Sequence, residues 1–112
     1  MVIYIIEDDP GVSDSLRFLL QAMGHAVSAY DDAETFLVEA EPQPQDVLII
    51  DLGLPGMSGA EAIREVTGRG WSPRIICITG QAQKTIDESL RDMPSTQVLR
   101  KPLSGETIVA LL

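Results

Sequence analysis

Hydrophobic residues follow two patterns along this chain. Short continuous apolar runs, rich in β-branched residues, alternate with longer stretches in which apolar residues recur every three or four positions. A continuous run is typical of a strand buried on both faces, whereas the second spacing is typical of a helix that buries one face. The runs predict strands at residues 2–6, 25–30, 47–50, 74–80 and 97–100. A helical pattern follows each run, so we expect five strand–helix units.

Residues that favour helix ends support these boundaries. Side chains that can accept hydrogen bonds from the free N–H groups of a helix precede four of the predicted helices, at Asp9, at Asp31 and Asp32, at Ser58 and at Ser104. Pro10 fits a first helical position, and Glu61 completes a capping box with Ser58. Gly24 and Pro94 are natural stops for the first and fourth helices.

Alternating strands and helices are typical of a parallel sheet with helices on both faces. We therefore predict an α/β fold of the (βα)5, flavodoxin-like type, with a five-stranded parallel sheet in a single domain that spans residues 1–112. In such sheets, ligands bind outside the carboxyl ends of the strands. Candidate chemistry is therefore expected where the strands end.

Charge is unevenly distributed along the chain. The net charge is −9. Residues 1–63 hold twelve acidic residues and one basic residue, whereas residues 64–112 hold five acidic and seven basic residues. This balance argues against direct nucleic-acid binding by this domain and against binding to an anionic membrane. No apolar run approaches the length of a membrane span. The single cysteine, Cys77, cannot form an internal disulfide, which favours a reducing, cytoplasmic compartment.

Polar residues that could perform chemistry lie at the ends of four predicted strands. They are Glu7, Asp8 and Asp9 after the first strand, Asp51 after the third, Thr79 at the end of the fourth and Lys101 after the fifth. Each has a structural explanation when taken alone, as a helix cap, a strand end or a surface turn. The predicted sheet would bring them to one edge, and Asp9 fits best as the cap of the first helix.

Acidic residues in one crevice need a partner for their charge. Two carboxylates about 5 Å apart repel by about 3 kcal/mol at an effective dielectric constant of about 20. Either the pKa of one carboxyl group rises, so that it becomes neutral, or a cation binds among the carboxylates. Oxygen ligands with few protein contacts favour Mg²⁺, which keeps several waters. Together with Lys101 and the hydroxyl of Thr79, the group resembles a phosphoryl-transfer clamp in which Asp51 is the nucleophile.

With these residues in view, the sequence resembles the receiver domains of bacterial two-component response regulators, the CheY-like family, over essentially its whole length. The motifs are I-I-E-D-D-P at 5–10, L-I-I-D-L-G-L-P-G-M-S-G at 48–59, I-C-I-T-G at 76–80 and L-R-K-P-L at 99–103. The I-T-G motif resembles the LuxR/FixJ class. The resemblance implies a cytoplasmic phosphorelay domain that is not a turnover enzyme and that belongs to transcription regulation.

The resemblance also implies roles by position. Asp51 would accept a phosphoryl group from the phosphohistidine of a histidine kinase in a Mg²⁺-dependent reaction. Asp8 would bind Mg²⁺ directly and Glu7 through water, while Asp51 and the backbone carbonyl of Gly53 would be further metal ligands. The last helix is short, and either it ends there or an output domain has been removed from a longer regulator.

Further roles follow for the ends of the last two strands. The hydroxyl of Thr79 would turn toward the phosphoryl group, and Lys101 would pair with it. The Lys101-Pro102 peptide is often cis in this family. The surface formed by the fourth helix, the fifth strand and the fifth helix would then change and control homodimerisation or an output.

Residue 98 departs from the family pattern. Val98 stands where a Tyr or Phe usually rotates between buried and exposed positions, so an alternative is a degenerate receiver that acts as a phosphorylation-independent interaction module. By the resemblance, two other positions, Gly53 and Gln81, would flank the hydrolytic water and influence the phosphate lifetime.

Two other classes are disfavoured. A phosphatase of the haloacid-dehalogenase class needs a second aspartate where this chain has Gly53. A flavodoxin-like cofactor binder needs a phosphate cradle after the first strand, where residues 7–9 are acidic.

Overall fold

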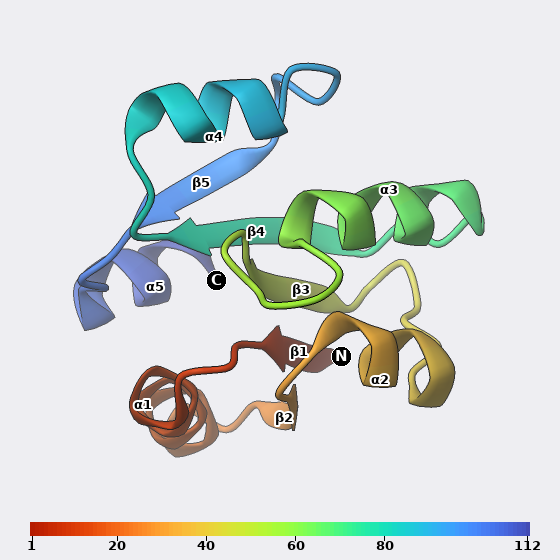
Figure 1. The fold of residues 1–112 in the computed structure, drawn as a ribbon. Coiled ribbons are helices and arrows are strands. Elements are labelled where there is room, and N and C mark those ends of the chain that lie inside the picture. Colours follow the sequence, from red (N-terminus) through yellow and green to blue (C-terminus); the bar gives the residue numbers. More distant parts are fainter.

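Strands and helices alternate strictly along the chain (Figure 1), as the sequence predicts. The computed structural model describes residues 1–112. The strands are β1 (Val2–Ile6), β2 (Ala26–Tyr30), β3 (Val47–Asp51), β4 (Arg74–Thr79) and β5 (Gln97–Arg100). The helices are α1 (Pro10–Ala22), α2 (Ala33–Glu39), α3 (Gly59–Gly68), α4 (Gln83–Ser89) and α5 (Gly105–Leu111). No helix is both long enough and apolar enough to cross a membrane.

The five strands form one sheet in the order β2-β1-β3-β4-β5. All four pairings are parallel, which confirms the predicted sheet. The strand order reverses beside β1, which pairs with both β2 and β3. A crevice is expected at this reversal, outside the carboxyl ends of the strands.

Side chains of each central strand point alternately into two apolar layers. Leu48 and Ile50 of β3 pack in the layer that holds buried residues of α2, α3 and α4. Val47 and Ile49 pack in the other layer, with buried residues of α1 and α5. All five residues of β3 are buried. Asp51 is therefore the last residue of the least accessible strand of the sheet, and this position restricts its movement.

Helix caps agree with the sequence in three cases. Asp9 Oδ1 accepts hydrogen bonds from the N–H groups of Gly11 and Val12, at 2.9 and 3.4 Å. Ser58 and Glu61 form the reciprocal capping box. Asp32, rather than Asp31, caps α2 through the N–H group of Thr35 at 2.7 Å.

One predicted helix boundary and one predicted capping bond are wrong. The fourth helix was expected to reach Pro94, but α4 ends at Ser89. Turns with hydrogen bonds from Met93 N to Leu90 O and from Thr96 N to Met93 O replace its last part and direct the chain into β5. Ser104 occupies the cap position of α5, but its side chain makes no capping hydrogen bond.

The junction between β3 and α3 is tightly packed at Gly59. A Cβ atom added at this glycine would overlap the backbone oxygen of Asp51 and would lie 2.7 Å from Leu52 Cα. The N–H group of Gly59 also donates to Leu52 O at 3.3 Å. Helix α3 can therefore approach the backbone beside Asp51 only because residue 59 has no side chain.

Replacing Gly59 with alanine should destabilise the protein by about 1–3 kcal/mol, because α3 or the end of β3 must shift to accept the methyl group. Gly68 lies in the same helix with nothing within 4 Å of an added Cβ. Gly68→Ala is the matched control and should leave stability unchanged or raise it by up to about 1 kcal/mol. Urea unfolding followed by circular dichroism measures both. Equal stabilities of the two variants would contradict the close packing at Gly59.

The thiol of Cys77 should be unreactive in the folded protein. Cys77 is fully buried in β4, and burial raises its pKa to about 12. Little thiolate therefore exists at pH 8, and no reagent can reach it. A thiol-directed reagent should modify the protein only in concentrated urea, as measured by intact mass. Rapid modification under native conditions would show that β4 opens readily.

Candidate functional site

Three carboxylates meet at the carboxyl ends of β1 and β3. Ile6 and Ile50 are aligned neighbours in these strands, so the residues that follow them also lie side by side. Carboxylate oxygens of Glu7, Asp8 and Asp51 all lie within 4.8 Å of one another. Glu7 is fully buried and Asp51 is 5% exposed, whereas Asp8 is exposed to solvent.

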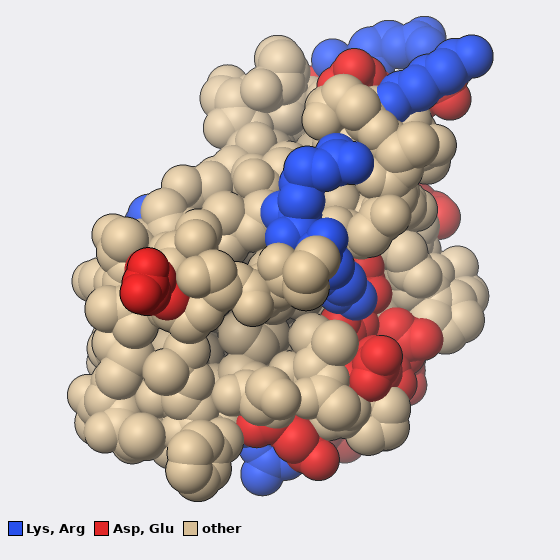
Figure 2. All heavy atoms as spheres, turned by 90° about the vertical axis from the view of Figure 1, so that its left-hand side faces the viewer, with Lys and Arg blue, Asp and Glu red and all other residues tan.

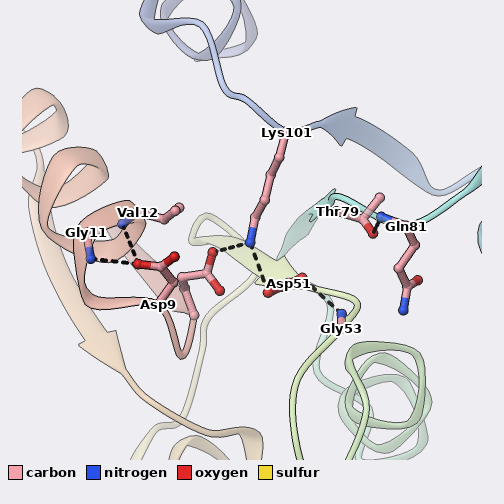
Figure 3. Close-up of polar contacts among 9 residues, drawn as sticks. Asp9, Gly11, Val12, Asp51, Gly53, Thr79, Gln81 and Lys101 are labelled. Carbon is pink, nitrogen blue, oxygen red and sulfur yellow. Dashed lines mark hydrogen bonds and ion pairs between the residues drawn. The ribbon is translucent and has the colours of Figure 1, made fainter.

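Lys101 reaches this group from the end of β5. Its Nζ atom lies 2.6 Å from Glu7 Oε1 and 3.1 Å from Asp51 Oδ2 (Figure 3). The Lys101-Pro102 peptide is cis. Seen from the carboxyl ends of the strands, acidic side chains gather directly beside basic ones on this face of the molecule (Figure 2). The ammonium group of Lys101 thus supplies positive charge to two buried carboxylates.

A backbone N–H group orients the other carboxylate oxygen of Asp51. Its Oδ1 atom accepts a hydrogen bond from the N–H group of Gly53 at 2.9 Å (Figure 3). An added Cβ atom at Gly53 would lie 3.6 Å from both Asp51 Oδ1 and Gln81 Nε2, which is ordinary contact. The loop after β3 therefore orients the carboxylate and still has room for a side chain at residue 53.

Thr79 lies at the same sheet edge but does not bond to Asp51. It is fully buried, and its Oγ1 atom accepts a hydrogen bond from the N–H group of Gln81 at 3.0 Å (Figure 3). Its backbone oxygen accepts from the N–H group of Lys101 at 2.8 Å. Thr79 is therefore connected both to Lys101, directly after β5, and to the loop that leads into α4.

Burial and the neighbouring charges separate the pKa values of the two buried carboxyls. Burial, together with the nearby Asp51 carboxylate, raises the pKa of Glu7 to about 7, although Lys101 acts to lower it. For Asp51, burial acts to raise the pKa, but Glu7, the Gly53 amide and Lys101 hold it below its ordinary value. Asp51 therefore carries the negative charge near neutral pH, as a nucleophilic carboxylate must.

The side chain of Lys101 keeps its charge at this site. Burial acts to lower its pKa, but bonds to Glu7 and Asp51 outweigh that effect and raise the pKa. An ammonium group in contact with two carboxylates is thus stable in its charged form.

These acidic side chains fit a hydrated divalent cation. Glu7 Oε2 is buried without a hydrogen-bond partner. An unpaired buried oxygen is costly unless a cation or a proton satisfies it. Three oxygen-bearing side chains, one of them open to solvent, are a ligand set that suits Mg²⁺ because this ion retains waters.

The structure brings together Glu7, Asp8, Asp51, Thr79 and Lys101, the side chains that the sequence predicts at one sheet edge. Asp9 is the helix cap that we expected. The amide of Gly53 contacts Asp51, while metal binding by its carbonyl stays a prediction.

Sequence reasoning missed the direct contact between Lys101 and Glu7. It placed Lys101 beside the carboxylate of Asp51 and paired it with the phosphoryl group. Both residues directly follow strands of the predicted sheet, so their proximity could have been inferred from the fold class. The distance between them could not, because it depends on side-chain conformation.

Val98 lies on β5 and is half-buried. It lines a hollow of about 480 Å³ between α4 and β5, together with Ile86, Leu90 and Arg100 among others. A valine cannot swing a ring into or out of this hollow, so the usual rotating switch residue is absent here.

Comparisons with known proteins agree with this site. The family described as the response regulator receiver domain matches residues 3–112. The transcriptional regulatory protein FixJ of Azorhizobium caulinodans is 31% identical over 108 residues, which are 96% of this chain and 51% of FixJ. This similarity agrees with the expected resemblance to the LuxR/FixJ class. The chain spans about half the length of the curated relatives it matches.

Solved structures show the same likeness. The response regulator StyR is 30% identical with a TM-score of 0.86, over 97% of this chain and 55% of StyR. The receiver domain of a sensor histidine kinase from Pseudomonas aeruginosa PAO1, solved with a magnesium ion in its active site cleft, is 25% identical with a TM-score of 0.82, over 98% of this chain and 92% of that one. Because the family match covers nearly the whole chain and the sheet order and acidic crevice agree with it, this chain belongs to the response regulator receiver domain family.

Proposed function

We propose that this receiver domain accepts a phosphoryl group on Asp51 from the phosphohistidine of a histidine kinase, in a Mg²⁺-dependent reaction. The observation that carries the proposal is the surroundings of Asp51. It ends a fully buried strand, accepts a hydrogen bond from Gly53 N, contacts Lys101 Nζ and lies within 4.8 Å of two further carboxylates.

The reaction needs only one bond to form and one to break at phosphorus. A carboxylate oxygen of Asp51 attacks phosphorus while the bond from phosphorus to the histidine nitrogen breaks, and the histidine leaves with that electron pair. The hydrogen bond from Gly53 and the contact with Lys101 hold the carboxylate in position. Lys101, already 3.1 Å from Asp51, then pairs with the phosphoryl oxygens.

Glu7, Asp8, Asp51 and the carbonyl of Gly53 would hold the Mg²⁺ ion, Glu7 through water. When bound, the ion supplies positive charge against the negative charge of the phosphoryl oxygens and the carboxylates.

A phosphoryl group on Asp51 would carry about −1.5 to −2 in place of the single negative charge of the carboxylate, so the charge at the edge of the sheet would change by about −0.5 to −1. Lys101 and the hydroxyl of Thr79 would be drawn toward the phosphoryl group, which requires Thr79 Oγ1 to leave the amide of Gln81. The surface of α4, β5 and α5 would then repack and control homodimerisation or an output in transcription regulation. The domain would act in the cytoplasm as a signalling switch rather than a turnover enzyme, without itself binding nucleic acid or membrane.

Incubation with a small acyl-phosphate donor and Mg²⁺ should add the mass of one phosphoryl group, detected by intact mass spectrometry. Asp51→Asn should abolish the adduct because the amide is not a nucleophile for phosphorus. Asp14→Asn, the same change at an exposed acid of α1, is the matched control and should keep the adduct.

Two results would contradict the proposal. An adduct that persists in Asp51→Asn would place the acceptor elsewhere. No adduct under any condition would favour the degenerate interaction module that the sequence left open.

Replacing Gly53 should change the lifetime of the phosphoryl group. A side chain fits at this position, facing Asp51 Oδ1 and Gln81 Nε2 at 3.6 Å. Gly53→Leu should slow hydrolysis severalfold by excluding water, and Gly53→Asn should also change the rate by placing an amide there. Phosphate release from the isolated phosphoprotein measures the rates, with Gly68→Ala as the control. Unchanged rates in both Gly53 variants would show that this position does not face the attacking water.

A further inference from the structure

Arg100 binds the loop that connects the candidate site to α4. In the sheet it lies directly opposite Thr79, its partner in register. Its Nη2 atom donates to Gln81 O and its Nη1 atom donates to Gln83 Oε1, both at 3.1 Å. Because Thr79 Oγ1 accepts from Gln81 N, one residue of the loop is held by Thr79 at its amide and by Arg100 at its carbonyl.

Helix α4 depends on such contacts because its own stabilisation is weak. It has seven residues, of which only Ile86 is buried. Ala82 stands at its N-cap and supplies no side-chain hydrogen bond. A short helix with little buried surface and no cap opens more easily than the rest of a domain. Arg100 bonds at this uncapped end, to Gln83 in the first turn and to Gln81, two residues earlier.

Another arginine holds the opposite end of α4. Arg64 of α3 donates to Ser89 O at 2.8 Å and to both carboxylate oxygens of Asp92, at 2.8 and 2.9 Å. None of these groups is at the sheet edge that carries Asp51. The N-terminal end of α4 is therefore the end whose contacts a change at Thr79 can alter.

We propose that Arg100 is the positioning residue that couples Thr79 to α4, through the backbone of Gln81. This inference rests on the proposed phosphorylation of Asp51. When the Thr79 hydroxyl turns toward the phosphoryl group, Gln81 N loses its acceptor, and the loop reorients at Gln81. Arg100 then loses Gln81 O, and the N-terminal turn of α4 is released.

This route does not need residue 98. Val98 borders the hollow between α4 and β5, but its side chain has no polar atom that could follow the movement of Thr79. Arg100 lines the same hollow and bonds both to Gln81 in the loop and to Gln83 in α4. The change at α4 is thus transmitted by hydrogen bonds rather than by a rotating ring.

Hydrogen exchange of α4, followed by mass spectrometry, tests the coupling. In the wild type, phosphorylation should speed exchange in residues 83–90 by about tenfold, which corresponds to the loss of about one charged hydrogen bond. Arg100→Gln should show fast exchange before phosphorylation and no further increase after it, while its phosphoryl adduct forms as in the wild type. Arg91→Gln removes the same charge from the same hollow without touching Gln81 or Gln83, and it should respond like the wild type.

A second measurement needs no phosphoryl group. Thr79→Val removes the acceptor of Gln81 N, so it should speed exchange of α4 in the wild-type background and have little further effect in Arg100→Gln. A double-mutant cycle of the wild type, the two single variants and the double variant thus measures the coupling of Thr79 and Arg100 directly.

The coupling is overturned if Arg100→Gln responds to phosphorylation by the same factor as the wild type, or if the effects of Thr79→Val and Arg100→Gln simply add. It is also overturned if the wild type gains the adduct with no change in α4. Failure of the proposed phosphorylation is seen separately, as the absence of an adduct in the wild-type mass spectrum, and the Thr79 and Arg100 cycle still decides the coupling.

Discussion

Two carboxylates buried at one sheet edge can be accommodated only if positive charge or a proton reaches them, and in this fold Lys101 supplies the positive charge. Its ammonium contacts Glu7 at 2.6 Å and Asp51 at 3.1 Å, and it comes from a strand that is adjacent to neither β1 nor β3. The contact is possible because parallel strands end at a common edge. The sheet order thus places the acids together, and the length of the lysine side chain spans the remaining distance.

The same cluster determines where the proton and the negative charge reside. Burial acts to raise the pKa of both carboxyls. For Glu7, burial and the neighbouring Asp51 raise the pKa to about 7, whereas Glu7, the Gly53 amide and Lys101 hold the pKa of Asp51 below its ordinary value. Two residues of one chemical type therefore have different roles because their surroundings differ. Asp51 keeps the charge that attack on phosphorus requires, and Glu7 remains able to respond to a cation.

Much of this could be predicted from the sequence because the relevant signals are local. The apolar runs identified the strands, Asp9 and Ser58 identified helix starts, and the sheet topology then placed Asp51 near Glu7. Features that depend on contacts between distant residues were missed. Asp46, a buried acid, accepts a hydrogen bond from Val2 N at 2.8 Å across 44 residues of sequence, and nothing in its neighbourhood in sequence indicates this.

The end of α4 was also missed. Its helical pattern continues to Met93, but local turns follow Ser89, where Arg64 of α3 donates to Ser89 O, and a helix of that length has little stability of its own. A weak element beside a rigid site is well suited to report a change, because a small loss of contacts is enough to alter its population of open states. In this chain, the groups that bond to both the loop and α4 belong to Arg100, while Val98 offers only packing. The loss of an aromatic side chain at residue 98 therefore does not by itself imply the loss of switching.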